Sequence, residues 1–182
     1  MRVKLSDLRI EYENIDYLLN QVYDIHKEKL GEGYLDINHF KQLSSTKRLF
    51  VAIKDKEVLG YITVSFSTEK EFFKSIKLDL NGEDISVMVL NTCAVKYEKC
   101  GVGTALVDFV LSNFSKEYKK IYSPVWKHGE VVNADGLLNK FNFLPLKEIP
   151  NFWYADSISQ ENFCPICNNP CTCSLVVYCK SL

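Results

Sequence analysis

Two glycines separated by one residue, Gly101 and Gly103, lie between an apolar stretch of strand length and a stretch with helical spacing of apolar residues. Glycine has no Cβ, so the backbone amides beside it can approach a ligand closely. The first amides of a helix lack partners within the helix and lie at the positive end of its dipole. A phosphate or pyrophosphate group therefore fits such a turn, although the same glycines would also let the helix pack closely on the strand.

The residues around the glycines do not complete either common nucleotide motif. The dinucleotide fingerprint needs a third glycine where this chain has Leu106, and a P-loop needs a lysine after the glycines. Residues 98–103 (EKCGVG) instead resemble the R/Q-x-x-G-x-G/A motif of the GCN5-related N-acetyltransferases, the GNAT family. The resemblance implies that the pyrophosphate of acetyl-CoA binds here. Both glycines match the motif, whereas Glu98 replaces the Arg or Gln of its first position.

The apolar stretch before the loop, residues 85–95 (ISVMVLNTCAV), has the length and the β-branched content of a strand. In the resembled fold this strand separates from its neighbour, here after Val95, and the opening takes the pantetheine arm of acetyl-CoA. The resemblance assigns acetyl-CoA contacts to one group of residues: Cys93, Ala94, Val95, Glu98, Lys99, Cys100, Gly101, Val102, Gly103, Thr104 and Asn133.

Residues 133–143 carry the second part of the resemblance, to the family's N-x-x-A/L-x-x-L-Y-x-x-x-G-F pattern. It implies that the Asn133 amide meets the pantetheine. Leu138 occupies the position of the tyrosine that protonates the departing thiolate in many family members. A thiolate with the pKa of an ordinary thiol can leave without an acid, so we expect turnover without a tyrosine at this position. Tyr122 and Tyr154 are the alternatives if an acid is used.

The reaction that the resemblance implies also needs a proton acceptor. An amine that has lost a proton attacks the thioester carbonyl, and a backbone amide near residues 93–95 would stabilise the oxyanion. His128 and Glu130, in the loop between the fifth predicted strand and the last predicted helix, are the candidate bases. The alternative for both is a solvated loop residue without a catalytic role. His26 and His39 are predicted to be surface or half-buried residues of the first two helices.

Four cysteines, Cys164, Cys167, Cys171 and Cys173, lie within ten positions near the end of the sequence. A C-x-x-C pair turns two sulfurs toward one point, and four thiolates form the usual tetrahedral site of structural zinc. The second pair is C-x-C, which keeps open the alternative of reduced thiols that pack as small apolar side chains. Cys179 is the substitute ligand if one of the four does not bind. Because a closed set of four sulfurs leaves no position for water, we predict a structural zinc ion.

Length and composition describe one globular domain of ordinary size with room for a small addition. The chain has 182 residues, of which 47% are hydrophobic and 25% charged, and a net charge of -1. The lysines are spread along the chain, which argues against a nucleic-acid partner. No apolar run approaches the roughly 20 residues of a membrane span, and the first residues lack the apolar core of a signal peptide. We therefore expect a cytoplasmic protein with reduced cysteines.

The spacing of apolar residues and the turn signals predict the remaining elements. They are a strand at 3–10, helices at 15–30 and 37–43, a hairpin of strands 48–53 and 58–66, a polar connection at 67–84, a helix at 104–114, a strand at 119–125, a helix at 132–141 and a closing strand at 150–156. The resemblance places the acceptor pocket at residues 31–43 and 67–84.

These features predict an α/β fold with a GNAT-like (acyl-CoA N-acyltransferase) mixed central sheet flanked by helices over residues 1–156, followed by a small cysteine-rich C-terminal unit at 157–182. The implied function is transfer of the acetyl group of acetyl-CoA to a primary amine, on a small molecule or a protein, by direct attack. The alternative is an acyl-CoA-binding sensor or a partner-binding protein with a decayed active site, which Leu138 and Glu98 favour. The acceptor and the oligomeric state stay open.

Overall fold

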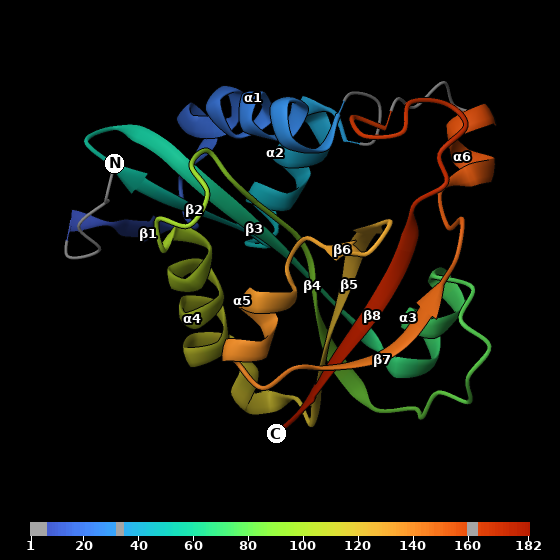
Figure 1. Cartoon of the computed structure of the whole chain (residues 1–182). Helices are drawn as coiled ribbons and strands as arrows, with labels where there is room; N and C mark the ends of the chain where they lie inside the picture. Colours follow the sequence, from blue (N-terminus) through green and yellow to red (C-terminus); the bar gives the residue numbers. More distant parts are fainter. Residues whose placement is uncertain (1–6, 32–34, 160–163) are drawn as a thin grey trace.

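The computed structural model describes residues 7–31, 35–159 and 164–182, so the predicted strand at residues 3–10 lies partly outside the described residues. The central sheet has the order β1-β2-β3-β4-β5-β8-β7, and the short β6 pairs with the end of β5 (Figure 1). Its strands are β1 (Arg9–Glu11), β2 (Leu49–Lys54), β3 (Glu57–Thr68), β4 (Ser86–Val95), β5 (Lys120–His128), β6 (Val131–Val132), β7 (Leu144–Ile149) and β8 (Ser174–Ser181). Paired strands are antiparallel except for β4 and β5, which are parallel. The predicted α/β fold with a mixed sheet is confirmed.

Helices cover both faces of the sheet (Figure 1). They are α1 (Leu19–Leu30), α2 (Ile37–Ser45), α3 (Glu69–Ser75), α4 (Val102–Phe114), α5 (Asp135–Lys140) and α6 (Tyr154–Ser159). Helices α4 and α5 share a core with Ile62 of β3, whereas α1 and α2 pack on the neighbouring Tyr61 from the other side. Successive side chains of a strand point to opposite faces, which explains this division. Within the described residues, no helix is both long and apolar enough to cross a membrane.

Helix α3 lies inside the stretch that was predicted to be a polar connection. Its first turn is fixed by a capping box, in which the Glu71 amide donates to Thr68 Oγ1 at 3.2 Å and the Thr68 amide donates to Glu71 Oε2 at 3.1 Å. Phe72 and Phe73 of α3 are buried against Val87, near the beginning of β4. This helix therefore packs at the end of β4 that lies away from the glycine loop.

The predicted closing strand at residues 150–156 is wrong. Residues 150–153 form a turn in which Asn151 has a φ of 53°, and α6 follows this turn. The strand that completes the sheet is β8, which lies between β5 and β7 and buries Leu175 and Val177. The C-terminal cysteine-rich segment thus leads directly into a strand of the central sheet, and the predicted boundary at residue 156 comes before that strand.

Candidate active site

Strands β4 and β5 pair at one end and separate at the other. Their parallel ladder ends at the pair Val89 and Tyr122, although β4 continues to Val95. The opening therefore begins earlier than the predicted position after Val95. Asn91 is an extra residue in the register of β4 with β3, and such a bulge bends a strand. Pro124 of β5 has no amide hydrogen to donate, which also weakens pairing at this point.

A cavity of about 370 Å³ occupies this opening. Residues 90–93 of β4 and 123–126 of β5 form two of its walls. His26 and Leu30 of α1 line it from one face of the sheet, and Val107 of α4 lines it from the other. The cavity therefore passes through the sheet, and molecules that approach from opposite faces could meet inside it.

The glycine turn forms the N-terminus of α4. Gly101 is the N-cap residue with a φ of 88°, a left-handed conformation that glycine adopts without strain. The Ala105 amide donates to the Gly101 carbonyl at 3.0 Å, and no side chain caps the helix. The amides of Val102, Gly103 and Thr104 come before that bond, so they are the ones a helix leaves without internal partners. Such amides can bind an anion, and the pyrophosphate site at this turn stays a prediction.

The position that a side chain would occupy at Gly103 faces β4 and α5. A Cβ at this position would lie 3.4 Å from Leu137 Cδ2, 3.8 Å from Val95 Cγ1 and 4.0 Å from Cys93 Sγ. An added side chain would thus extend from the amide turn toward the cavity, which Cys93 and Leu137 both line. The turn and the cavity are neighbours in the fold.

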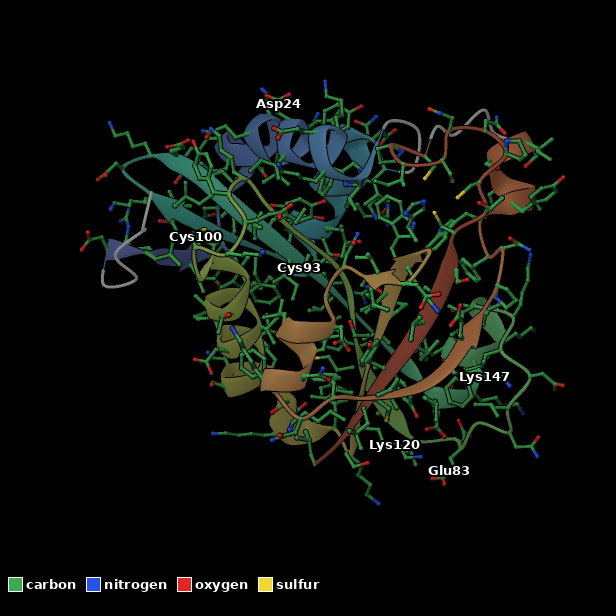
Figure 2. All side chains as sticks on the ribbon, in the orientation of Figure 1. Asp24, Glu83, Cys93, Cys100, Lys120 and Lys147 are labelled. Atoms are coloured by element: carbon green, nitrogen blue, oxygen red, sulfur yellow. The ribbon has the colours of Figure 1, made fainter. Side chains whose placement is uncertain are left out.

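The remaining residues with predicted acetyl-CoA contacts lie in different environments. Cys93 lies near the centre of the molecule (Figure 2) and lines the cavity. Its side chain is accessible from the cavity but surrounded by protein, and burial raises the pKa of its thiol to about 12. Ala94 is buried on the α1 side. Glu98 and Lys99 are exposed in the turn before α4, and Cys100 Sγ donates to a backbone carbonyl at 2.8 Å.

The start of α5 supplies the wall of the cavity next to β5. Asn133, Leu137 and Leu138 all line it, and Leu138 is almost fully buried. The two tyrosines considered as substitutes for an acid lie elsewhere. Tyr122 donates a hydrogen bond to the buried carboxylate of Glu69 on the α3 side of the sheet, and Tyr154 is exposed on α6. Among the described residues, no tyrosine lines the cavity.

The two predicted bases lie in the β5–β6 hairpin. His128 is the last residue of β5 and pairs with Val131, while Glu130 lies in the turn. Both side chains are exposed, and neither lines the cavity. The structure therefore does not bring them together with the other predicted site residues.

His26 is a cavity residue that the sequence did not identify as part of the site. The prediction of a surface or half-buried residue is wrong, because its side chain is only 2% exposed. Its Nδ1 lies 2.7 Å from Tyr61 Oη, and its ring packs edge-on against Phe40. Burial and, secondarily, the charge of His39 lower the pKa of His26 to about 4. The burial of His26 could have been predicted from its position beside Val22 and Ile25 on the apolar face of α1.

The four clustered cysteines converge as the sequence predicts. Their sulfur atoms all lie within 4.8 Å of one another, in the segment that leads to β8. Cys167 Sγ lies 3.6 Å from both Cys171 Sγ and Cys173 Sγ, and Cys164 Sγ lies 3.8 Å from Cys173 Sγ. Burial would raise the pKa of Cys167, but the Thr172 amide that donates to its sulfur and the neighbouring thiols lower it to about 7. These four thiols could hold a metal ion.

The cysteine cluster also forms part of the cavity wall. Cys164, Pro165 and Cys171 line the cavity on the α1 side, together with Trp153 from the turn before α6 and Leu35 from the segment before α2. Of residues 31–43, where the resemblance implies part of the acceptor pocket, Leu35 lines this cavity, and residues 32–34 lie outside the described residues. Residues 67–84, the other predicted stretch, do not line this cavity. Residues of the connection between β7 and β8 form part of its wall instead.

Comparison with protein-family models and with curated proteins finds no match. Solved structures, in contrast, match over nearly the whole chain. Arabidopsis thaliana NAA60 in complex with acetyl-CoA has a TM-score of 0.71 at 15% identity, covering 96% of this chain and 98% of that one. Arabidopsis thaliana Naa50 in complex with the bisubstrate analogue CoA-Ac-MVNAL has a TM-score of 0.66 at 18% identity, covering 97% and 99%. Drosophila melanogaster polyamine N-acetyltransferase has a TM-score of 0.62 at 10% identity, covering 97% and 100%.

These likenesses define the class of fold. The chain has the GNAT acyl-CoA N-acyltransferase fold along almost its entire length, as the glycine motif and the order of elements predict. At identities of 10 to 18%, the likeness concerns the fold, and the function must be argued from the site.

Proposed function

We propose that this protein is an N-acetyltransferase that moves the acetyl group of acetyl-CoA to a primary amine by direct attack. The observation that carries the proposal is the cavity through the sheet, with the unpartnered amide turn of α4 beside it. A cofactor held at that turn and an amine that arrives from the α1 side would reach the same space between β4 and β5. The solved complexes of similar fold with acetyl-CoA and with a CoA bisubstrate analogue support this proposal.

The residues present fit acetyl-CoA in three ways. The amides of Val102, Gly103 and Thr104 at the start of α4 would hold the pyrophosphate. The edge of β4 from residue 91 to 95 has no ladder to β5, so its backbone groups could pair with an extended amide-containing arm. Asn133 lies at the opposite wall, where its side-chain amide could bind the same arm.

In this proposal the reaction is a simple exchange of bonds. The amine nitrogen bonds to the acetyl carbonyl carbon, the carbon–sulfur bond breaks, and the proton that the amine loses balances the thiolate that leaves. Positioning of the two reactants supplies most of the rate. His128 and Glu130 stay the candidate bases, and because neither lines the cavity, each would act through intervening water.

The second candidate function is an acyl-CoA-binding sensor without turnover. Leu138 at the wall of the cavity and the absence of tyrosine among the described lining residues favour it. The two functions are separated by one experiment in which acetyl-CoA binding is measured by calorimetry and thiol release is followed with a panel of primary amines. Binding with amine-dependent thiol release supports the enzyme, whereas binding with no release by any amine supports the sensor.

We also propose that the four clustered cysteines bind one structural zinc ion. Zinc–sulfur bonds of about 2.3 Å in a tetrahedron place the sulfurs about 3.8 Å apart. Three of the sulfur–sulfur separations, at 3.6 to 3.8 Å, agree with that geometry and are far longer than the roughly 2.05 Å of a disulfide. All four sulfurs lie within 4.8 Å of one another. All seven cysteines are free thiols, which fits a reducing compartment such as the cytoplasm.

A further inference from the structure

His26 has one ring nitrogen bonded and one unused. Its Nδ1 is paired with Tyr61 Oη at 2.7 Å, whereas Nε2 is buried and has no hydrogen-bond partner among the described residues. Buried polar atoms without partners are rare in native proteins, and a water molecule or a ligand is the usual explanation for one. Nε2 itself is closed to solvent, and His26 lines the cavity, so a molecule in the cavity that reaches this ring would be the partner of Nε2.

The position of the proton on His26 follows from counting unpaired groups. If Nδ1 carried the proton and donated to Tyr61, the buried tyrosine hydrogen and the Nε2 lone pair would both be unpaired. If Tyr61 donates to Nδ1, the tyrosine hydrogen is paired, and of these groups the Nε2 hydrogen alone has no partner among the described residues. Burial also raises the pKa of Tyr61, which therefore keeps its proton. The second arrangement leaves fewer buried groups unpaired, so Nε2–H is a neutral hydrogen-bond donor.

A donor at this position does not act as a base. A histidine whose pKa is lowered to about 4 stays neutral near pH 7 and is a poor proton acceptor for an amine. It can instead bind an oxygen atom. The surfaces near this end of the cavity are apolar, with Leu30, Leu35, Trp153 and Pro165 among the lining residues. An acceptor amine with an apolar side chain therefore fits these surfaces better than an acceptor with a second charged group.

We propose that His26 Nε2–H donates a hydrogen bond to a carbonyl oxygen of the acceptor, and that the acceptor is an α-amine with an adjacent carbonyl group and an apolar side chain, as at the amino terminus of a peptide. This inference rests on the proposed function and names the class of its amine substrate. A polyamine, which has no oxygen, would leave Nε2–H without a partner.

The test uses two amines that differ in the carbonyl group. Leucinamide has an α-amine, an apolar side chain and a carboxamide, and isoamylamine is the same molecule without the carboxamide. The variant His26→Leu should lower kcat/KM for leucinamide about ten- to hundredfold and change that for isoamylamine by less than about threefold. The variant His26→Gln, which keeps a neutral N–H donor, should recover most of the loss. Comparing each variant with the wild type on the same amine cancels the different basicities of the two amines.

Equal losses on both amines would show that His26 only supports the fold and would overturn the inference. A measurement on the wild type covers the case in which His26→Leu does not fold. Nitrogen NMR of the imidazole should show the proton on Nε2 and a shift of that signal when leucinamide, but not isoamylamine, is added. A proton on Nδ1 would contradict the proposal.

The same experiments separate this inference from the proposed function. If the protein acetylates both amines and the His26 variants affect them equally, the acetyltransferase function stands and the inference fails. If the protein neither binds acetyl-CoA nor acetylates any amine, the proposed function fails and the inference fails with it.

Discussion

The sulfur of Cys173 lies 3.6 Å from that of Cys167, and Cys173 immediately precedes β8, which lies between β5 and β7 in the sheet. A metal ion held by the cluster would thus be attached to the central sheet through Cys173. At the same time Cys164 and Cys171 line the cavity, so the metal would fix the shape of one of its walls. Two further bonds secure this region to α6, because the Cys171 amide donates to Ser157 Oγ at 2.8 Å and Asn169 Nδ2 donates to the Ser157 carbonyl at 2.6 Å.

We predict about one zinc ion per chain in protein purified without added metal, and loss of that zinc in the variant Cys173→Ser. The matched control is Cys179→Ser, since Cys179 lies in β8 outside the cluster. Elemental analysis of the three proteins checks the prediction. An ordered, metal-free wild-type protein would show that the cysteines are packing residues.

Removal of the metal should affect the acceptor more than the cofactor. The cluster lines the cavity on the α1 side, whereas the amide turn belongs to α4 on the other face. A chelator should therefore raise the KM of the amine about tenfold or more, because small displacements of a binding wall are costly, while the affinity for acetyl-CoA changes little. If chelation abolished acetyl-CoA binding, the cysteine segment would have to be part of the cofactor site.

The variant Gly103→Val should weaken acetyl-CoA binding by more than about tenfold, because a branched side chain beside the amide turn would extend toward Cys93 and Leu137. The control is Gly136→Ala in α5, where an added Cβ meets nothing within 4 Å. Calorimetric titration with acetyl-CoA compares both variants with the wild type. Unchanged affinity in Gly103→Val would remove the turn from the cofactor site.

Turnover should not depend on a tyrosine acid. The variant Tyr154→Phe should leave kcat unchanged, because Tyr154 is exposed on α6. Tyr122→Phe should lower the melting temperature, since it removes a buried hydrogen bond to Glu69, but should leave the kcat of the folded enzyme within about threefold. Steady-state kinetics and thermal unfolding together test this. A collapse of kcat in either folded variant would reveal an acid that the geometry does not indicate.

Protonation of His26 should destabilise the fold. Its pKa is lowered to about 4 in the folded protein, so between about pH 6.5 and pH 4 the unfolded chain binds a proton that the folded chain does not. The free energy of unfolding should therefore fall across this range as pH falls, by up to about 3 kcal/mol from this residue. Urea unfolding of the wild type and of His26→Leu at pH 7 and pH 4.5 isolates the contribution. The exposed His128, substituted as His128→Gln, serves as the control. Equal pH dependence in the wild type and His26→Leu would contradict the assigned shift.

Local signals predicted much of the fold. The glycine turn between a strand and a helix depends on neighbouring residues, and the structure has it at Gly101 with α4 beginning at the next residue. The spacing of the cysteines likewise predicted their convergence. The capping box of Thr68 and Glu71 was also visible in the sequence, and it would have indicated α3 before the structure did.

Non-local relationships could not be predicted in the same way. Whether residues 150–156 or 174–181 complete the sheet depends on which strand fits between β5 and β7, and both stretches contain suitable apolar residues. The burial of His26 depends on Tyr61 and Phe40, which are distant in the sequence. The same holds for the position of the cysteine cluster beside the cavity, which follows from the path of the β7–β8 connection.

The most direct test of an acetyltransferase site between β4 and β5 is detection of its product. Isotope-labelled acetyl-CoA is incubated with the protein and a set of amines that includes leucinamide, and the amines are analysed by mass spectrometry. We expect the label in the amine, in amounts that depend on the protein and that fall with Gly103→Val but not with Gly136→Ala. Acetyl-CoA that binds to the protein while no amine ever acquires the label would contradict the enzymatic function and leave the acyl-CoA sensor as the better explanation.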